Sequence, residues 1–172
     1  MTYIYDIFSK KLTEVAPFTV DLLLPSGAEN LNYVLYTDES PYKMQREWLD
    51  RLPFDIYSVN VHTGAKRLIG RSYRTAPKWS VNGKWAVMYD PIAQVWNKFD
   101  GATGKVVNIS DAIGYPMFME SYDKPAPAPA YGIAGWTADG NNVFLYDAYD
   151  WWKIDLTGER QPECLTKGYG RK

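Results

Sequence analysis

Two stretches of the chain alternate polar turns with apolar, β-prone runs, and the two stretches read almost alike. Residues 79–90 read WSVNGKWAVMYD, and residues 136–147 read WTADGNNVFLYD. Asn82-Gly83 and Asp139-Gly140 favour two-residue hairpin turns of type I′, in which both central residues have positive φ. The apolar run after each turn is typical of a strand that is buried on both faces. The pattern therefore predicts the same hairpin twice.

Trp79 and Trp136 open these two stretches, directly before the turn. Their matched positions predict that they are equivalent core residues that join adjacent repeats. A fainter third copy of the apolar run reads NYVLYTD at residues 32–38. A unit that recurs about every 40–60 residues is typical of propeller blades or of another repeat array.

A second pattern also repeats: a strand ends in Asp or Asn and is followed by a tight turn and a short outer strand. Asp and Asn suit this position because their side chains bond the backbone two residues further on. The four copies are YIYDIFSK at 3–10, where Lys10 replaces the usual Gly, YSVNVHTG at 57–64, NKFDGATG at 97–104 and WKIDLTG at 152–158.

These repeats together predict an all-β fold, a partial β-propeller of about three and a half four-stranded antiparallel blades of the WD-repeat-like kind. The chain is then a single propeller-type domain over residues 1–172, with a partial blade at about 1–15 and fuller blades at about 18–70, 72–110 and 130–167. A β-sandwich would also give short strands with regular turns. The matched repeats favour the propeller.

Residues 40–53, SPYKMQREWLDRLP, interrupt the blade pattern between the second and third strands of their unit. Ser40 is a suitable N-cap, and a proline follows it, so we predict a helical insertion. Met44, Trp48 and Leu52 then share one helical face. The insertion is expected to be a lid packed on its own blade, with a binding element as the alternative.

Residues 114–130, GYPMFMESYDKPAPAPA, form a long connection that ends in alternating proline. Such a run prefers an extended polyproline II conformation and does not join a central strand. Its aromatic and Met side chains are expected to pack over the face of the propeller. Because long loops often carry function, it is the best place for a contact site.

Composition narrows the classes of partner. The chain has 172 residues, 46% of them hydrophobic and 16% aromatic, and a formal net charge of −1. Without a basic run we expect no nucleic-acid partner. No stretch reaches the ~18 consecutive apolar residues of a membrane span, so we expect no membrane partner.

The residue inventory predicts no catalytic, cofactor-binding or metal-binding residue. His62 is the sole histidine and is expected to be a solvated turn residue rather than a catalytic base. Cys164 is the sole cysteine, so no intrachain disulfide can form, and we expect a small buried residue in an outer strand. A zinc site needs more His and Cys ligands than these two. There is no Gly-x-Ser-x-Gly motif and no phosphate-binding Gly loop. The substrate-contacting residues are unknown at this level.

Two pairs of neighbouring residues remain as candidates for sugar chemistry. Asp147 and Asp150 are close in sequence, but carboxylates at such positions usually make turn hydrogen bonds. Spacing alone does not assign a glycosidase pair. Trp151-Trp152 could stack on a sugar, but adjacent strand residues point to opposite faces, so at least one is expected in the core.

The last third of the chain resembles a known family. YGIAGWT from Tyr131, YDAYDWWKID from Tyr146 and LTKGYGRK from Leu165 are similar to the propeller of large bacterial prolyl-oligopeptidase-family serine peptidases of the dipeptidyl-peptidase-like kind. DIYSVNVHTG and APKWSVNGKWAVMYD, within residues 52–109, fit the same propeller more generically. The resemblance implies an N-terminal propeller that caps an α/β-hydrolase domain and restricts its substrates to peptides. It also implies an exported, periplasmic parent protein; the chain itself does not reveal its compartment.

The hydrolase part of that family has no counterpart here, so the resemblance transfers no catalytic residue. We expect a fragment that gates or positions peptide substrate for a hydrolase domain absent from this chain. The alternatives are a non-enzymatic WD-repeat-like scaffold for protein interaction and, less favoured, a carbohydrate-binding propeller. Because so few blades leave sheet edges open, we also expect self-association through residues 1–15 or 130–167.

Overall fold

The structure is a computed structural model that describes residues 1–17, 20, 22–25, 32–49 and 51–172. Within these residues, fourteen strands form four antiparallel sheets, and the only helices are three short 3-10 segments. The predicted all-β class is therefore confirmed. None of the helices in this part of the chain is long and apolar enough to cross a membrane.

The sheets follow one another along the chain, and each is built from consecutive strands. Sheet 1 pairs β1 (Thr2–Asp6) with β2 (Lys11–Ala16). Sheet 2 contains β3 (Leu22–Leu24), β4 (Tyr33–Asp38), β5 (Phe54–Asn60) and β6 (Lys66–Tyr73). Sheet 3 contains β7 (Lys78–Trp79), β8 (Trp85–Asp90), β9 (Val95–Asp100) and β10 (Val106–Asn108). Sheet 4 contains β11 (Ile133–Trp136), β12 (Asn142–Tyr146), β13 (Trp151–Asp155) and β14 (Glu163–Cys164).

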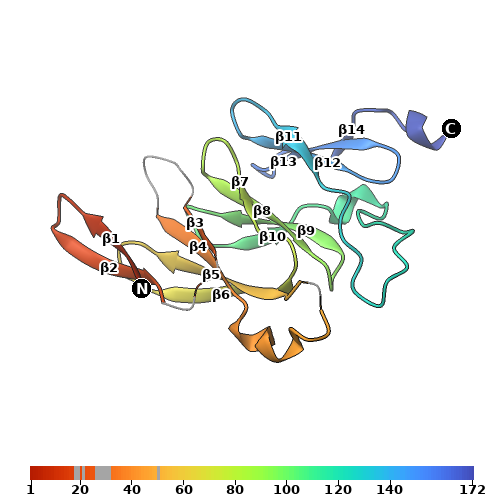
Figure 1. Cartoon of the computed structure of the whole chain (residues 1–172). Helices are drawn as coiled ribbons and strands as arrows, with labels where there is room; N and C mark the ends of the chain where they lie inside the picture. The colour runs from red at the N-terminus through yellow and green to blue at the C-terminus, as the bar shows by residue number, and fades with distance from the viewer. Residues whose placement is uncertain (18–19, 21, 26–31, 50) are drawn as a thin grey trace.

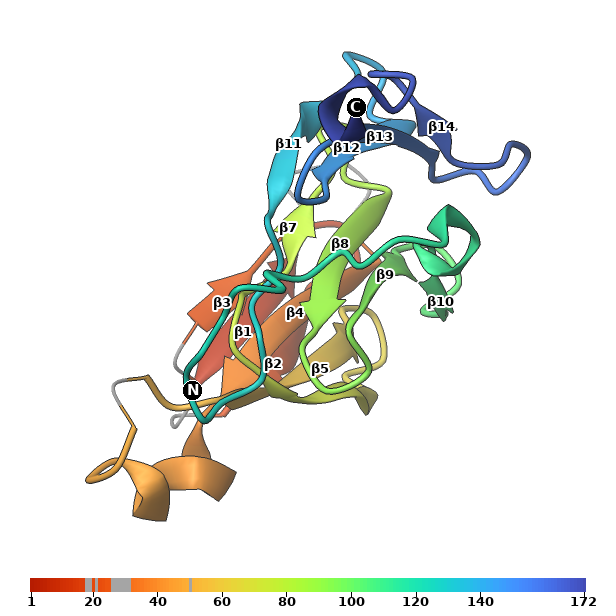
Figure 2. The same ribbon diagram turned by 90° about the vertical axis from the view of Figure 1, so that its right-hand side faces the viewer.

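Figure 1 shows sheet 1 and sheet 4 at opposite ends of the series, with sheets 2 and 3 between them, and Figure 2 shows the same series turned by 90°. An apolar cluster lies at each junction between consecutive sheets. Val15 of sheet 1 packs in one cluster with Val59 of sheet 2. Leu35 of sheet 2 shares a second with Phe99 of sheet 3, and a third joins sheets 3 and 4. The hydrophobic core is thus divided into layers between sheets.

The two matched hairpins lie where the sequence predicts them, but their turns are not of type I′. Each connection has five residues between its strands, and of the central pair only the glycine has positive φ, 65° at Gly83 and 68° at Gly140. In each turn the side chain of the residue before the glycine, Asn82 or Asp139, stabilises the loop by accepting a backbone hydrogen bond. Asn82 Oδ1 accepts from the Lys84 amide at 3.0 Å, and Asp139 Oδ1 accepts from the Asn141 amide at 2.9 Å. These local bonds hold a wider loop than the dipeptide rule assumes.

The four Asp or Asn turns have the predicted geometry. In each turn a carboxylate or amide oxygen of Asp6, Asn60, Asp100 or Asp155 accepts from the amide two residues on, at 2.7–3.0 Å. Three of the turns end on a glycine with positive φ, and Lys10 takes the equivalent place with φ of 54°. The unusual Lys therefore adopts the same backbone conformation as the glycines it replaces.

Trp79 and Trp136 have equivalent positions at the junctions between sheets, although both are half-buried rather than fully buried. Trp79 packs in the cluster between sheets 2 and 3, and its Nε1–H donates to the carbonyl of Leu24 at 2.9 Å. Trp136 packs in the cluster between sheets 3 and 4. The predicted role of joining adjacent units is confirmed for both.

The insertion between β4 and β5 differs from the predicted amphipathic helix. It contains one 3-10 helix, Ser40–Gln45, in which Glu39 rather than Ser40 has the N-cap position and no side chain caps the end. Met44 and Trp48 are 87% and 78% exposed, and only Leu52 is buried. The 3-10 helix ends at Gln45, so no continuous helix brings all three apolar residues to one face. The expected lid contact is therefore not formed by Met44 and Trp48.

The connection over residues 114–130 packs partly as expected. Met117 is buried in the cluster between sheets 3 and 4, and Phe118 forms an isolated antiparallel bridge with Ala130. Tyr115 and Met119 remain exposed. The connection thus covers one end of the junction between sheets 3 and 4, and the side chain of Tyr115 stays half-exposed.

Candidate functional site

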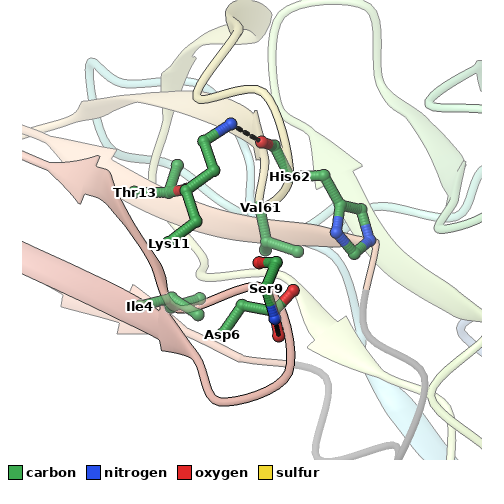
Figure 3. Close-up of a pocket in the computed structure, with 7 residues that line it drawn as sticks. All are labelled: Ile4, Asp6, Ser9, Lys11, Thr13, Val61 and His62. Carbon is green, nitrogen blue, oxygen red and sulfur yellow. Dashed lines mark hydrogen bonds between the residues drawn. The ribbon is translucent and has the colours of Figure 1, made fainter.

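A cleft of about 430 Å³ lies between sheet 1 and the turn after β5 (Figure 3). Sheet 1 supplies one wall because alternate residues of β1 and β2 face sheet 2, and the β5–β6 turn supplies the other. The lining residues are Ile4, Asp6, Ser9, Lys11, Thr13, Val61 and His62.

The cleft holds the residue types of a catalytic triad without the contacts of one. The Asp6 carboxylate accepts from the amides of Ser9 and Phe8, at 3.1 and 2.9 Å, and these bonds, with one from the Ser9 side chain, lower the pKa of Asp6. His62 Nε2 lies 3.4 Å from Asn32 Oδ1, and Figure 3 shows its ring apart from Ser9. A nucleophile has to bond its base, and the base has to bond its acid. The predicted role of His62 as an exposed turn residue is confirmed.

The contact that crosses this cleft is structural. Lys11 Nζ donates to the carbonyl of His62 at 2.5 Å (Figure 3). The same kind of hydrogen bond joins sheet 2 to sheet 3 and sheet 3 to sheet 4. Arg67 of sheet 2 donates to the carbonyl of Gly104 at 3.1 Å, and Lys98 of sheet 3 donates to the carbonyl of Leu156. Each junction thus has one basic side chain of one sheet bound to a turn carbonyl of the next.

A second polar cluster, the arginine clasp, joins the β12–β13 turn to the 3-10 helix Tyr169–Arg171. Arg171 binds two carboxylates at once: Nη2 lies 2.6 Å from Asp147 Oδ2, and Nη1 contacts Asp150. Both carboxylates are almost fully buried. Trp152 Nε1–H also donates to Asp147 at 2.7 Å, and the Thr166 hydroxyl donates to Asp150 at 2.5 Å.

Aromatic rings cover the clasp. The Arg171 guanidinium lies 4.0 Å from the ring centroid of Tyr115 and 5.2 Å from that of Tyr149, within the range of cation–π contact. Tyr115 belongs to the long connection and also packs on Trp152, with ring centroids 5.9 Å apart. The packing expected of the aromatic side chains of the long connection is therefore made by Tyr115, on sheet 4.

The electrostatics of the clasp do not suit acid–base chemistry. Burial raises the pKa of Asp147, but hydrogen bonds from Arg171, Trp152 and two backbone amides outweigh it and hold that pKa below its usual 3.8. A general acid needs the opposite shift, and both carboxylates are already engaged as ion-pair partners of Arg171. The prediction that Asp147 makes turn bonds is confirmed, since its Oδ1 accepts from the amides of Tyr149 and Asp150 at 2.7 Å.

Trp151, Trp152 and Cys164 were the other residues considered from the sequence. Trp152 is buried and Trp151 is 48% exposed, as their opposite orientations require. Cys164 lies in the outer strand β14 and is half-buried rather than fully buried. In the described ranges, no three His, Cys, Asp or Glu side chains are grouped to hold a metal ion.

Sequence reasoning missed Arg171, which completes the clasp. The sequence motifs that carry the family resemblance do contain this cluster. YDAYD contributes Asp147 and Asp150, and GYGRK contributes Gly170 and Arg171. In comparisons with known proteins, the chain matches no protein-family model and no curated protein sequence.

Proposed function

We propose that this chain is a non-catalytic propeller segment that gates or positions peptide substrate for a serine hydrolase domain outside this chain. Sheets 2, 3 and 4 would be its blades, and sheet 1 the outer half of another. The proposal is supported by the packing of each four-stranded meander on the next through its own apolar cluster. Radial repetition of such meanders is the architecture of a propeller.

The observation that carries the peptidase assignment is the arginine clasp. Residues of the motif that resembles prolyl-oligopeptidase-family propellers, from Asp147 to Arg171, meet in one cluster with two ion pairs. Residues from two of the motifs that carry the resemblance are therefore in contact with one another in the folded chain.

The test follows the native protein with an antibody raised against this chain and a fluorophosphonate probe, which labels active serine hydrolases. We expect a protein well above the 19.7 kDa of this chain that takes up the probe, while the purified chain takes up none and hydrolyses no peptide p-nitroanilide. Labelling of the purified chain would refute the non-catalytic role. An unlabelled native protein would refute the peptidase assignment.

A protein-interaction scaffold is the second candidate, and the exposed aromatic surface favours it. Trp48, Tyr149, Trp151 and Tyr169 are each 48–78% exposed. Aromatic side chains are enriched at protein interfaces. An unlabelled native protein that co-purifies with a stoichiometric partner would support this candidate. For the carbohydrate-binding alternative, Trp152 of the pair Trp151-Trp152 is not available to stack on a sugar, because it is buried and donates a hydrogen bond to Asp147.

A further inference from the structure

A small cavity of about 60 Å³ lies where three segments of the chain meet, inside the series of sheets rather than at either end of it. The loop between β6 and β7, the end of β8 and the connection over residues 114–130 each contribute to its wall. The residues that matter for its chemistry are Arg74 from the loop, Tyr89 and Pro91 from the end of β8, and Tyr122, Pro127 and Pro129 from the connection.

Tyr89 brings a buried hydroxyl to this cavity. The residue is 2% exposed, and its hydroxyl has no hydrogen-bond partner within the described ranges. Most buried polar groups in folded proteins are hydrogen-bonded, because leaving one without a partner is unfavourable. Burial and the nearby charge of Asp90 raise the pKa of Tyr89 to about 12, so the hydroxyl keeps its proton at neutral pH. Tyr89 is therefore a donor that the folded chain leaves unused.

Arg74 is the second donor that lines the cavity. Its side chain is half-buried, and it forms no ion pair with any residue that the structure describes. The half-buried Arg171 of the clasp, by contrast, binds two carboxylates. An arginine keeps its charge at any physiological pH and has five N–H donors and no acceptor. Arg74 thus brings a positive charge and unused donors to the same cavity.

The nearby Asp90 does not supply the acceptor that these donors need. Its Oδ1 accepts from the amides of Ile92 and Ala93, at 2.9 and 3.0 Å, and Asp90 does not line the cavity. The prolines of the wall have no N–H group and present apolar rings. The cavity therefore combines two unused donors, one of them cationic, with an apolar wall.

The volume and the donors together select a carboxylate as the ligand group. One water molecule takes up about 30 Å³ of liquid, so the cavity has room for roughly two oxygen-sized groups, which is small for a tetrahedral phosphate. A guanidinium binds the two oxygens of a carboxylate as a planar fork, and a hydroxyl donates to a charged oxygen more strongly than to a neutral one. Water would satisfy the Tyr89 hydroxyl but would not balance the charge of Arg74.

We propose that this cavity is a carboxylate-binding site, in which Arg74 pairs with the carboxylate of a ligand and the Tyr89 hydroxyl donates to it. The proline rings and Tyr122 flank the small group that carries the carboxylate. The site goes beyond the function proposed above and needs no hydrolase domain. Its carboxylate has two sources, a free small acid or the C-terminus of a peptide, and the peptide source alone rests on that proposed function.

The test is a titration of the ¹⁵N-labelled chain, followed by NMR through the backbone amide of Thr75 and the Nε–H group of Arg74. The probes are acetate, acetyl-alanine and acetyl-alanine amide, which has no carboxylate. We expect the better of the two acids to bind with a Kd that is roughly millimolar, as for other ligands of so few atoms. The amide should bind about 10-fold more weakly or worse, because it lacks the charge. Tighter binding of acetyl-alanine assigns the site to a peptide terminus, and tighter binding of acetate assigns it to a free acid.

Three variants then test the two donors. Arg74→Gln and Tyr89→Phe should each weaken binding of the acid about 10-fold, as for the loss of a hydrogen bond to a charged group. Arg71→Gln is the matched control, because Arg71 is an exposed cation of β6 outside the cavity. Tyr89→Phe should also keep the melting temperature of the parent chain, since the lost hydroxyl has no partner in the described part of the chain.

Four results would overturn the proposal: no binding of either acid, equal binding of the amide, a Tyr89→Phe variant that binds like the parent chain, or an equal loss in Arg71→Gln. Binding of inorganic phosphate as tight as that of the better acid would overturn the carboxylate assignment. None of these results depends on labelling of the native protein by the fluorophosphonate probe. The carboxylate site and the proposed peptidase role can therefore fail separately.

Discussion

Trp79 shows how one residue joins two sheets. Its ring lies edge-on to Phe99 of sheet 3, with centroids 6.1 Å apart, and its Nε1–H reaches the Leu24 carbonyl of sheet 2. Trp136 has the equivalent place at the following junction. Apolar packing and one directional bond thus act on the same ring, which fixes how the two sheets meet.

Trp79→Ala and Trp136→Ala should each lower the free energy of unfolding by about 3 kcal/mol, since large-to-small changes at packed positions leave a cavity. The matched control is Trp48→Ala, because Trp48 is 78% exposed and should change the free energy by less than about 0.5 kcal/mol. Urea denaturation monitored by circular dichroism measures all three. A variant at 79 or 136 that unfolds like the Trp48 control would show that the repeat alignment is wrong there.

Arg171→Ala should destabilise the chain by about 1–3 kcal/mol, because it leaves two buried carboxylates without their cation, while Arg171 itself is partly exposed to solvent screening. Arg171→Lys should recover part of this loss only, since an ammonium does not bind two carboxylates as a planar fork does. Lys172→Ala is the control at an exposed neighbouring cation. An Arg171→Lys variant as stable as the parent chain would contradict the role of the planar guanidinium.

Acid should weaken the clasp in a defined window. The pKa of Asp147 in the folded chain lies below its ordinary value of 3.8, so the unfolded chain takes up its proton first as the pH falls. The stabilisation by Asp147 is therefore fully present above the unfolded pKa and is lost as the pH falls through the folded one. Urea midpoints at about pH 6 and about pH 3 should differ more for the parent chain than for Asp147→Asn. An equal pH dependence of the two proteins would rule out this linkage.

At the scale of elements, the two matched hairpins contact each other at their tips. The Asn82 side-chain amide donates to the carbonyl of Asp139 at 2.7 Å, from sheet 3 to sheet 4. A Cβ at Gly140 would lie 2.7 Å from Asn82 Cγ and 2.8 Å from the Asn82 amide nitrogen. Gly140 is thus required both for its φ of 68° and for this close approach.

Gly140→Ala should cost more than the ~1 kcal/mol of a left-handed backbone, because the new methyl group displaces the Asn82 hairpin. Gly158→Ala is the matched control, since Gly158 also has positive φ, 85°, but nothing lies within 4 Å of the added methyl group. Thermal unfolding of the two variants separates steric contact from backbone strain. Equal melting temperatures would mean that the hairpins can move apart freely.

Sequence patterns predicted the four Asp and Asn turns, whose interactions are local, and did not predict the arginine clasp, where distant segments meet. The turns at Asp6, Asn60, Asp100 and Asp155 follow from one side chain and its next few amides, and all four were predicted. The helical periodicity of residues 40–53 was misleading, because Met44 and Trp48 stay exposed and only Leu52 of the three periodic residues is buried. Arg171 could not be assigned from spacing, since its carboxylates lie more than twenty residues away across a strand and a loop.

At the largest scale, the described sheets form a series of layers, and among them sheet 3 alone has a four-stranded neighbour on each face. Stability in such a series depends on each unit and its contacts with the units beside it. Sheet 3 should therefore be the last unit to open, and sheet 1, with two strands and one neighbour, the first.

Hydrogen exchange followed by mass spectrometry should show the slowest exchange in β8 and β9 and faster exchange in β1, β2 and β14, because local opening follows burial. Uniform protection along the chain would show that the sheets open as one cooperative unit.

The three bridges from basic side chains to turn carbonyls have a consequence for how this surface can evolve. Lys11, Arg67 and Lys98 bind main-chain oxygens at positions 62, 104 and 156, and every amino acid carries such an oxygen. The bond itself therefore places no requirement on the side chain at the receiving position. Leu156 is fixed for another reason, its burial in the core, and Gly104 by its φ of 67°, whereas the exposed His62 is bound by neither requirement. Relatives could therefore differ in the side chain displayed at position 62 and still keep sheets 1 and 2 in register.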